Sequence, residues 1–141
     1  MRALVESARR WRVVFAFLPM ISAACSTVEA TKATSAEPFI GSWVGSWRNQ
    51  TNPAFNGEVD VEIAMDSENR PSGLRFTAKL TNATAPWFAA TGLLRDGGLA
   101  FTAPGGTTLQ FMLHGEDRIE ATYYNPNNRE SGTWNLRRRP R

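Results

Sequence analysis

The chain has 141 residues, of which 42% are hydrophobic, enough to bury the core of one domain. Its formal net charge of +3 comes from the N-terminus: residues 1–24 contain four arginines and one glutamate, and the remainder has 12 basic and 12 acidic residues. A nucleic-acid partner is therefore not expected, because a neutral chain lacks the charge that binds phosphates. The arginines at 137–139 and 141 are typical of a solvated chain end.

Residues 1–24 have the pattern of an export signal. Four arginines precede a 12-residue apolar run, VVFAFLPMISAA, which ends in small residues. A positive start, a short apolar segment and small residues before a cleavage site are typical of a secretory signal. A transmembrane helix needs about 20 apolar residues, so this run is too short to form one. We therefore expect a signal peptide over residues 1–24.

Cys25 follows this signal and, as the one cysteine of the chain, has no internal disulfide partner. The tetrapeptide Ser-Ala-Ala-Cys at 22–25 resembles a bacterial lipobox. That resemblance implies attachment of a lipid such as palmitate to Cys25, and Ser26 after it implies an outer-membrane lipoprotein that faces the periplasm. The alternative is ordinary cleavage and free secretion, for which small residues stand at Ala24, Ala30 and Ala36.

Residues 25–38 are expected to form a flexible tether, because they are rich in Ser, Thr and Ala and have no apolar period. From 39 to 141 apolar and polar residues alternate between frequent turn signals, which predicts an all-β domain. Eight strands are expected, at 39–48, 56–66, 73–81, 86–95, 98–103, 107–114, 117–124 and 131–138.

The turns between these strands predict which residues face each other. The Asp96-Gly97 turn, for example, places Leu94 opposite Leu99. Pairing the apolar faces across the other turns gives a register for each hairpin. The predicted partners are Ile63 with Leu74, Leu99 with Phe111, Leu113 with Ile119, and Tyr123 with Trp134.

Short connections and one apolar face favour an eight-stranded antiparallel up-and-down barrel, with a two-sheet sandwich as the alternative. The first strand carries Gly41-Ser42-Trp43, which resembles the opening strand of the calycin superfamily, the lipocalin and avidin-like barrels. The resemblance implies a barrel closed by its first and last strands, with Arg138 packed on Trp43. The chain lacks the disulfides of lipocalins and the polar interior of a biotin site, so the resemblance supplies no ligand.

The interior of this barrel is expected to be aromatic. Eight strands leave room only for side chains or for one small ligand. We therefore expect a small apolar ligand at the barrel mouth; the alternative is a solid core acting as an interaction or inhibitor-like module on an envelope protein. The candidate ligand-binding residues are Trp43, Trp47, Phe76, Phe101, Phe111, Tyr123 and Trp134.

A second candidate surface lies on the outside. Trp87, Met112 and Tyr124, with Leu93, point outward in the predicted strands, where they would form an apolar patch. Such patches mark partner surfaces.

Catalysis, cofactors and metal binding are not expected. His114 is the one histidine, and its position next to a turn favours a solvated imidazole over a heme ligand. One histidine and one cysteine do not make up the four ligands of a structural zinc site. Ser42 and Ser46 have no histidine in register to activate them. Glu58, Asp60 and Glu62 form an acidic row on one face of a predicted strand. Cross-strand ion pairs explain this row, since Glu62 is expected opposite Arg75 and Glu58 opposite Lys79.

Overall fold

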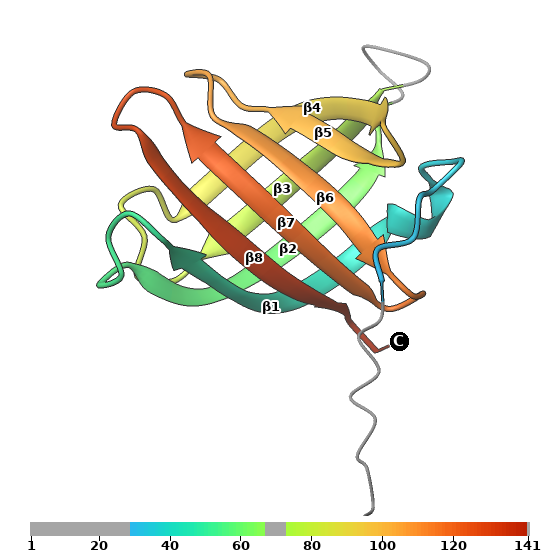
Figure 1. Ribbon diagram of the computed structural model, residues 1–141, viewed down its shortest axis with the longest axis horizontal. Helices are drawn as coiled ribbons and strands as arrows, with labels where there is room; N and C mark the ends of the chain where they lie inside the picture. The colour runs from blue at the N-terminus through green and yellow to red at the C-terminus, as the bar shows by residue number, and fades with distance from the viewer. Residues whose placement is uncertain (1–28, 67–72, 141) are drawn as a thin grey trace, which may run out of the picture.

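The computed structural model describes residues 29–66 and 73–140, and these form a closed antiparallel barrel in which each strand pairs with its neighbours in chain order (Figure 1). All eight predicted strands are present, after a short 3-10 helix, η1 (Glu37–Phe39). None of the described residues belongs to a helix long and apolar enough to cross a membrane. The strands are β1 (Gly41–Asn49), β2 (Asn56–Met65), β3 (Leu74–Leu80), β4 (Trp87–Arg95), β5 (Gly98–Thr102), β6 (Thr108–His114), β7 (Arg118–Asn125) and β8 (Glu130–Arg138).

The barrel closes where β1 pairs with β8. Trp47 lies opposite Trp134 across this seam, and Trp43 lies opposite Arg138. Gly45 permits the close approach, because a Cβ atom there would stand 1.9 Å from the carbonyl oxygen of Asn135. The predicted pairing of first and last strands is confirmed, and the two-sheet alternative is excluded.

Three of the predicted hairpin registers are confirmed. They are those of β4–β5, β5–β6 and β6–β7, in which Leu94 faces Leu99, Leu99 faces Phe111, and Leu113 faces Ile119. These hairpins have tight turns built on Gly97, Gly105-Gly106 and Gly115, all with positive φ. Glycine accepts that backbone conformation at little cost, so the turns are visible in the sequence.

Two predicted registers are wrong. In β2–β3, Ile63 faces Phe76 rather than Leu74, and in β7–β8, Trp134 faces Ala121 rather than Tyr123. Each error is a slip of two residues. Side chains alternate with a period of two, so such a slip keeps every residue on its face, and the apolar pattern does not detect it.

Side chains in the β7–β8 turn select the observed register. The carboxamide oxygens of Asn125 and Asn128 accept hydrogen bonds from the backbone N–H groups of Asn127 and Glu130, at 3.0 and 3.1 Å. Arg129, which follows Asn128, adopts a φ of 56°. These local bonds set the length of the turn, and the strands follow it.

The centre of the barrel is filled by aromatic rings. Phe76 and Phe101 have centroids 4.7 Å apart, and Phe111 lies 5.5 and 5.3 Å from them in edge contacts. All three are almost completely buried. This cluster lies between the two ends of the barrel, which differ in what covers them.

One end is covered by the N-terminal segment. Thr31 donates a backbone hydrogen bond to the carbonyl of Leu113 at 2.7 Å, and Ala33 donates one to Gly97 at 2.8 Å. The segment then turns through η1 and inserts Phe39, which has no exposed surface, into the barrel. Residues 31–38 were expected to lie in the flexible tether, but they follow the barrel because these backbone bonds and Phe39 hold them.

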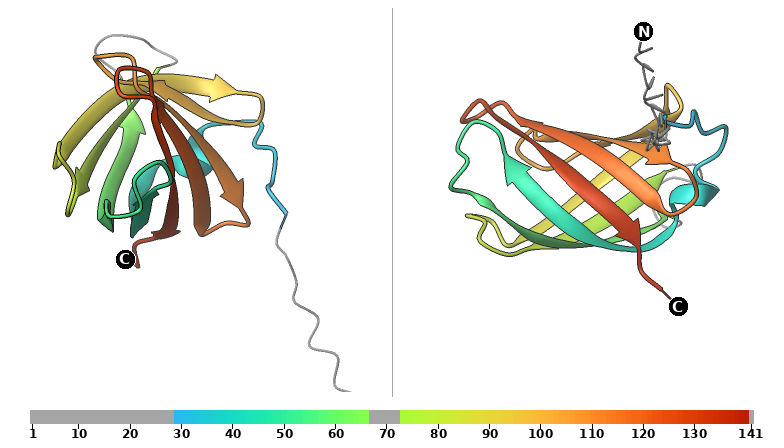
Figure 2. Two further views of the ribbon diagram at one scale, coloured as in Figure 1. Left: turned by 60° about the vertical axis from the view of Figure 1, so that its left-hand side comes forward. Right: turned by 60° about the horizontal axis from the view of Figure 1, so that its bottom comes forward.

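The other end is ringed by the four loops at 50–55, 81–86, 103–107 and 126–129. Because the strands alternate in direction, these loops lie together, opposite the end that residues 29–40 cover (Figure 2). We call the first end the closed end and the second the mouth.

Candidate functional site

The mouth contains a cavity of about 340 Å³, at the small end of the range for ligand sites. Strand residues form its floor and loop residues form its rim. Its lining is mainly apolar and aromatic, with amide and hydroxyl side chains around it. The lining residues are Trp47, Asn49, Phe55, Leu80, Ala83, Thr84, Ala85, Phe88, Thr107, Leu109, Tyr123, Asn125, Asn128, Glu130 and Trp134.

Three of the seven predicted ligand-binding residues line this cavity: Trp47, Tyr123 and Trp134. The other four, Trp43, Phe76, Phe101 and Phe111, are buried elsewhere in the packed interior. Alternation predicts which side chains point inward but carries no information on how far along the barrel axis the packing leaves space.

Sequence reasoning missed most of the wall and rim. Phe88 was predicted to point inward but not to bind a ligand, and Phe55 was not singled out although it is the one aromatic residue in loop 50–55. Leu80 is the last residue of β3, and Leu109 is the first inward-facing residue of β6. Both line the cavity. Their positions at strand ends, next to loops, are the sequence signal from which they could have been predicted to line the cavity.

Asn49 holds the rim in place. It is buried, with 3% of its surface exposed, and its side-chain oxygen accepts hydrogen bonds from the backbone N–H groups of Thr51 and Asn52 at 2.9 and 2.8 Å. Its own N–H donates to the carbonyl of Phe55 at 2.9 Å. Loop 50–55 is thereby fixed over the cavity, with Phe55 as part of the wall.

The indole rings differ in how their N–H groups are bonded. Trp47 Nε1 donates to the carbonyl of Thr81 at 2.9 Å, and Trp43 Nε1 donates to the carbonyl of Phe39 at 2.8 Å. Trp134 Nε1 is buried and has no partner among the described residues. Leaving a buried donor without a partner costs about 1–3 kcal/mol. Such a group in a cavity wall is a candidate for ligand contact.

Tyr123 places a phenol in the same wall. Burial, and to a smaller extent the negative charge of Glu130, together raise the pKa of this phenol from 10.0 to about 12. The hydroxyl therefore stays protonated near neutral pH and keeps a proton to donate. Glu130 is the charged residue among those that line the cavity.

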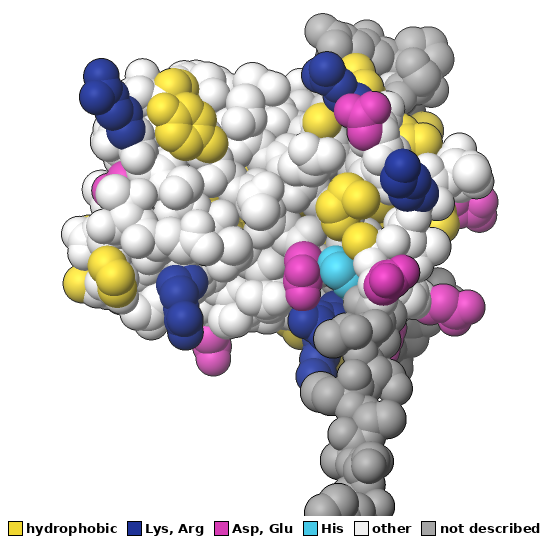
Figure 3. Space-filling model, viewed as in Figure 1, with side chains coloured by type: hydrophobic (Ala, Val, Ile, Leu, Met, Phe, Trp, Pro, Cys, Tyr) yellow, Lys and Arg dark blue, Asp and Glu magenta, His cyan; other side chains and the backbone are white. Residues whose placement is uncertain are grey.

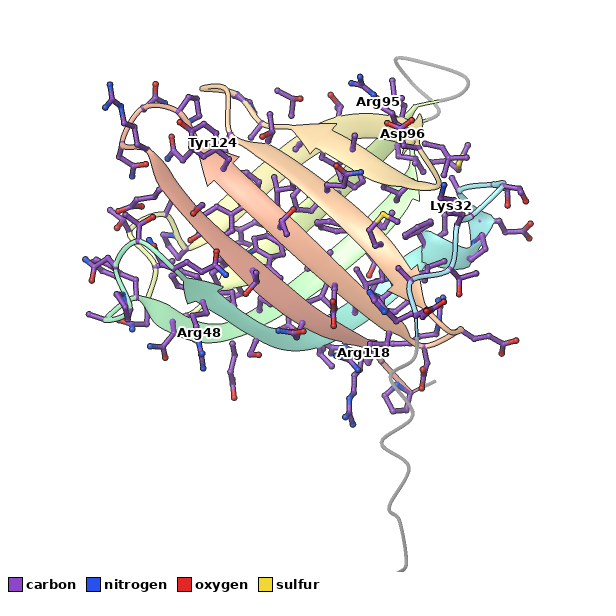
Figure 4. The ribbon with its side chains drawn as sticks, in the orientation of Figure 1. Lys32, Arg48, Arg95, Asp96, Arg118 and Tyr124 are labelled. Carbon is purple, nitrogen blue, oxygen red and sulfur yellow. The ribbon has the colours of Figure 1, made fainter. Side chains whose placement is uncertain are left out.

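The two ends of the barrel carry different surface chemistry. The mouth loops at 50–55, 81–86, 103–107 and 126–129 contain one charged residue, Arg129, and their polar side chains are mainly those of Asn and Thr. Figure 4 shows Lys32, Arg95, Asp96 and Arg118 toward the closed end, and Arg48 on β1 toward the mouth. The rim is thus polar but nearly uncharged.

The predicted partner surface is not one patch. Trp87 and Tyr124 are exposed, at 66% and 47%, but they lie on β4 and β7, with two strands between them. Met112 lies on β6 toward the closed end and is partly covered. Figure 3 shows hydrophobic side chains on this face as separate spots. The structure therefore does not bring the three residues together.

His114 is less exposed than predicted. Its side chain is only 13% exposed, and its Nε2 lies 3.3 Å from a carboxylate oxygen of Glu120. The N-terminal segment runs beside it, since Thr31 pairs with Leu113. Within the described residues no group of three or more His, Cys, Asp or Glu side chains could hold a metal ion.

The ion pairs predicted for the acidic row are wrong because they depended on the slipped β2–β3 register. Lys79 faces Asp60, and Arg75 faces Ala64. Asp60 instead forms an ion pair with Arg139, from the chain end beyond β8. Asp60 therefore ties the C-terminal segment to the barrel wall.

The packing of Arg138 on Trp43, which the resemblance implied, is present. The guanidinium carbon lies 4.2 Å from the indole centroid. Its Nη1 donates to the carbonyl of Ile40 at 3.1 Å, and its Nη2 donates to the carbonyl of Pro38. This arginine joins β8 to the segment that covers the closed end.

Comparison with models of protein families gives no match, and comparison with curated proteins gives none either. The barrel is similar to the solved structure of a redesigned beta barrel, with a TM-score of 0.55 and 13% identity over 79% of this chain and 100% of that chain. At this identity the likeness shows the fold alone. The predicted lipid-attachment residue, Cys25, and the predicted signal peptide lie outside the described residues.

Proposed function

We propose that this protein is a non-enzymatic, calycin-like barrel that binds a small apolar ligand in the mouth cavity. The observation that carries the proposal is the contrast inside the barrel. Aromatic rings fill its centre, whereas Trp47, Tyr123 and Trp134 wall an open space at one end. A cavity with an apolar wall and a few polar groups is the usual form of a small-molecule site.

Lipid attachment at Cys25 and a place in the cell envelope, facing the periplasm, complete the proposal. Its support is the sequence around Cys25 together with the course of the chain, because residue 29 leaves the barrel at the closed end (Figure 2). A lipid at Cys25 would therefore hold the mouth away from the membrane surface.

Binding is tested with the neutral fluorescent probe N-phenyl-1-naphthylamine on protein purified after expression of the full chain. We expect saturable binding to the wild type and a loss of affinity of at least tenfold in Ala83→Phe, which fills the cavity. Ala89→Phe is the matched control, since Ala89 is exposed on the outer face of β4. Absence of saturable binding would favour the interaction or inhibitor-like module instead.

The anchor is tested separately by labelling cells with radioactive palmitate. We expect the wild type to carry label and Cys25→Ser to carry none. An unlabelled wild type would leave free secretion as the better proposal, without bearing on the cavity.

A further inference from the structure

The floor of the mouth cavity contains an indole whose N–H group has no partner in the part of the chain that the structure describes. Trp134 is 4% exposed, and its ring packs against Phe111 and Phe76 at centroid distances of 6.0 and 6.2 Å. These contacts hold the ring in place in the cavity floor. The bonded N–H groups of Trp43 and Trp47 show that the same barrel satisfies indoles elsewhere.

The charge around the cavity restricts what the ligand can be. Glu130 places a carboxylate in the wall of the cavity, close enough to the Tyr123 phenol to add to the increase in its pKa that burial causes. Among the described lining residues no lysine or arginine balances it. An anionic group such as a fatty-acid carboxylate would meet both this repulsion and the loss of its own hydration.

We infer, building on the proposed mouth site, that the ligand is an uncharged, largely apolar molecule with a carbonyl oxygen that accepts a hydrogen bond from Trp134 Nε1. The apolar wall binds the body of such a molecule, and the carbonyl supplies an acceptor that the described residues do not offer to Trp134 Nε1. The Tyr123 hydroxyl is a second donor in the same wall.

The inference is tested with three probes that share one two-ring skeleton: 2-acetylnaphthalene, 2-ethylnaphthalene and 2-naphthoate. Calorimetric titration of the full-chain product at neutral pH should rank the ketone about tenfold tighter than the hydrocarbon, the gain typical of one hydrogen bond. The carboxylate should bind at least tenfold more weakly than the ketone, and Glu130→Gln should reduce that difference.

Trp134→Phe should bring the ratio of ketone to hydrocarbon affinity close to one. Trp47→Phe is the matched control: it also removes an indole from the wall, but its N–H group is already bonded to Thr81, so the ratio should persist. In wild-type protein labelled with nitrogen-15, the Trp134 indole N–H resonance should shift downfield with the ketone and not with the hydrocarbon. That measurement does not depend on a variant that folds.

Equal affinity for ketone and hydrocarbon, or a Trp134 resonance that the ketone does not move, would overturn the inference while leaving the mouth as a binding site. Binding of none of the three probes would remove the proposed function as well, and this inference with it.

Discussion

Arg138 shows how much one side chain contributes at the closed end. It stacks on Trp43 and donates hydrogen bonds to carbonyl groups of Pro38 and Ile40, which belong to the covering segment. Hydrogen bonds from charged groups and cation–π contacts contribute more than surface ion pairs because they are partly desolvated.

Replacing Arg138 with alanine should therefore lower the free energy of unfolding by about 2–3 kcal/mol. Urea denaturation measures this. Arg137→Ala, next to it on the exposed face of β8, should change stability by about 0.5 kcal/mol or less. Equal effects of the two substitutions would contradict the role given to Arg138.

Tyr123 should make stability fall at high pH. Its pKa is raised to about 12 in the folded protein, above the ordinary value of 10.0, so the fold favours the neutral phenol. The resulting stabilisation is complete below pH 10 and is lost as the pH rises toward 12. Urea unfolding at a series of alkaline pH values should show this loss in the wild type and in Tyr124→Phe, but a smaller loss in Tyr123→Phe. The same slope in all three proteins would refute the assignment to Tyr123.

At the scale of the strand, the seam between β1 and β8 depends on Gly45. A methyl group there would meet the carbonyl oxygen of Asn135 at 1.9 Å, and that atom is backbone that cannot rotate away.

Gly45→Ala should cost about 3 kcal/mol, at the upper end for overpacking, because the strands must separate. Ser46→Ala, at the next and exposed position, should change stability by about 0.5 kcal/mol or less. Thermal unfolding followed by circular dichroism compares them. A tolerated Gly45→Ala would mean that the seam is looser than described.

The strands themselves were predictable because alternation and turn glycines are local signals. All the strands and three hairpin registers follow from them, as does the outward direction of Trp87. The β2–β3 and β7–β8 registers did not follow, because a slip of two residues leaves the apolar pattern unchanged. In the β7–β8 turn, Asn125 and Asn128 fix the register through hydrogen bonds from the backbone to their side chains.

The site was only partly predictable for a related reason. Sequence alternation placed Trp47, Tyr123 and Trp134 inside together with Phe76 and other rings. It did not show that the rings pack tightly at the centre and leave space at the mouth, because that depends on how side chains from several strands fill the same volume. The covering segment was missed since backbone hydrogen bonds, rather than apolar periodicity, attach residues 31–33.

At the scale of the whole molecule, the closed end and the mouth are separated by the packed aromatic cluster. Phe39 belongs to the first and the ligand cavity to the second. Changes at sites that share no partners usually act independently.

Phe39→Leu should therefore lower the free energy of unfolding by about 1.5 kcal/mol through imperfect filling. It should leave the affinity for N-phenyl-1-naphthylamine within about twofold of the wild type, as additivity between distant sites implies. Denaturation and probe titration on the same preparation measure both quantities. A parallel loss of affinity would show that the two ends are coupled through the core.

Residues 29 and 140, the first and last that the structure describes, both belong to the closed end, where Arg139 donates its backbone N–H to the carbonyl of Ser42. The barrel is therefore like a cup: the mouth is its opening, and both described chain ends lie at its base. A fluorescent protein fused beyond residue 141, or a bead coupled to the N-terminal side, would sit behind the cup and leave its opening unobstructed. Loop sequences around that opening could also be exchanged without touching the base, which makes recognition and attachment separate engineering problems.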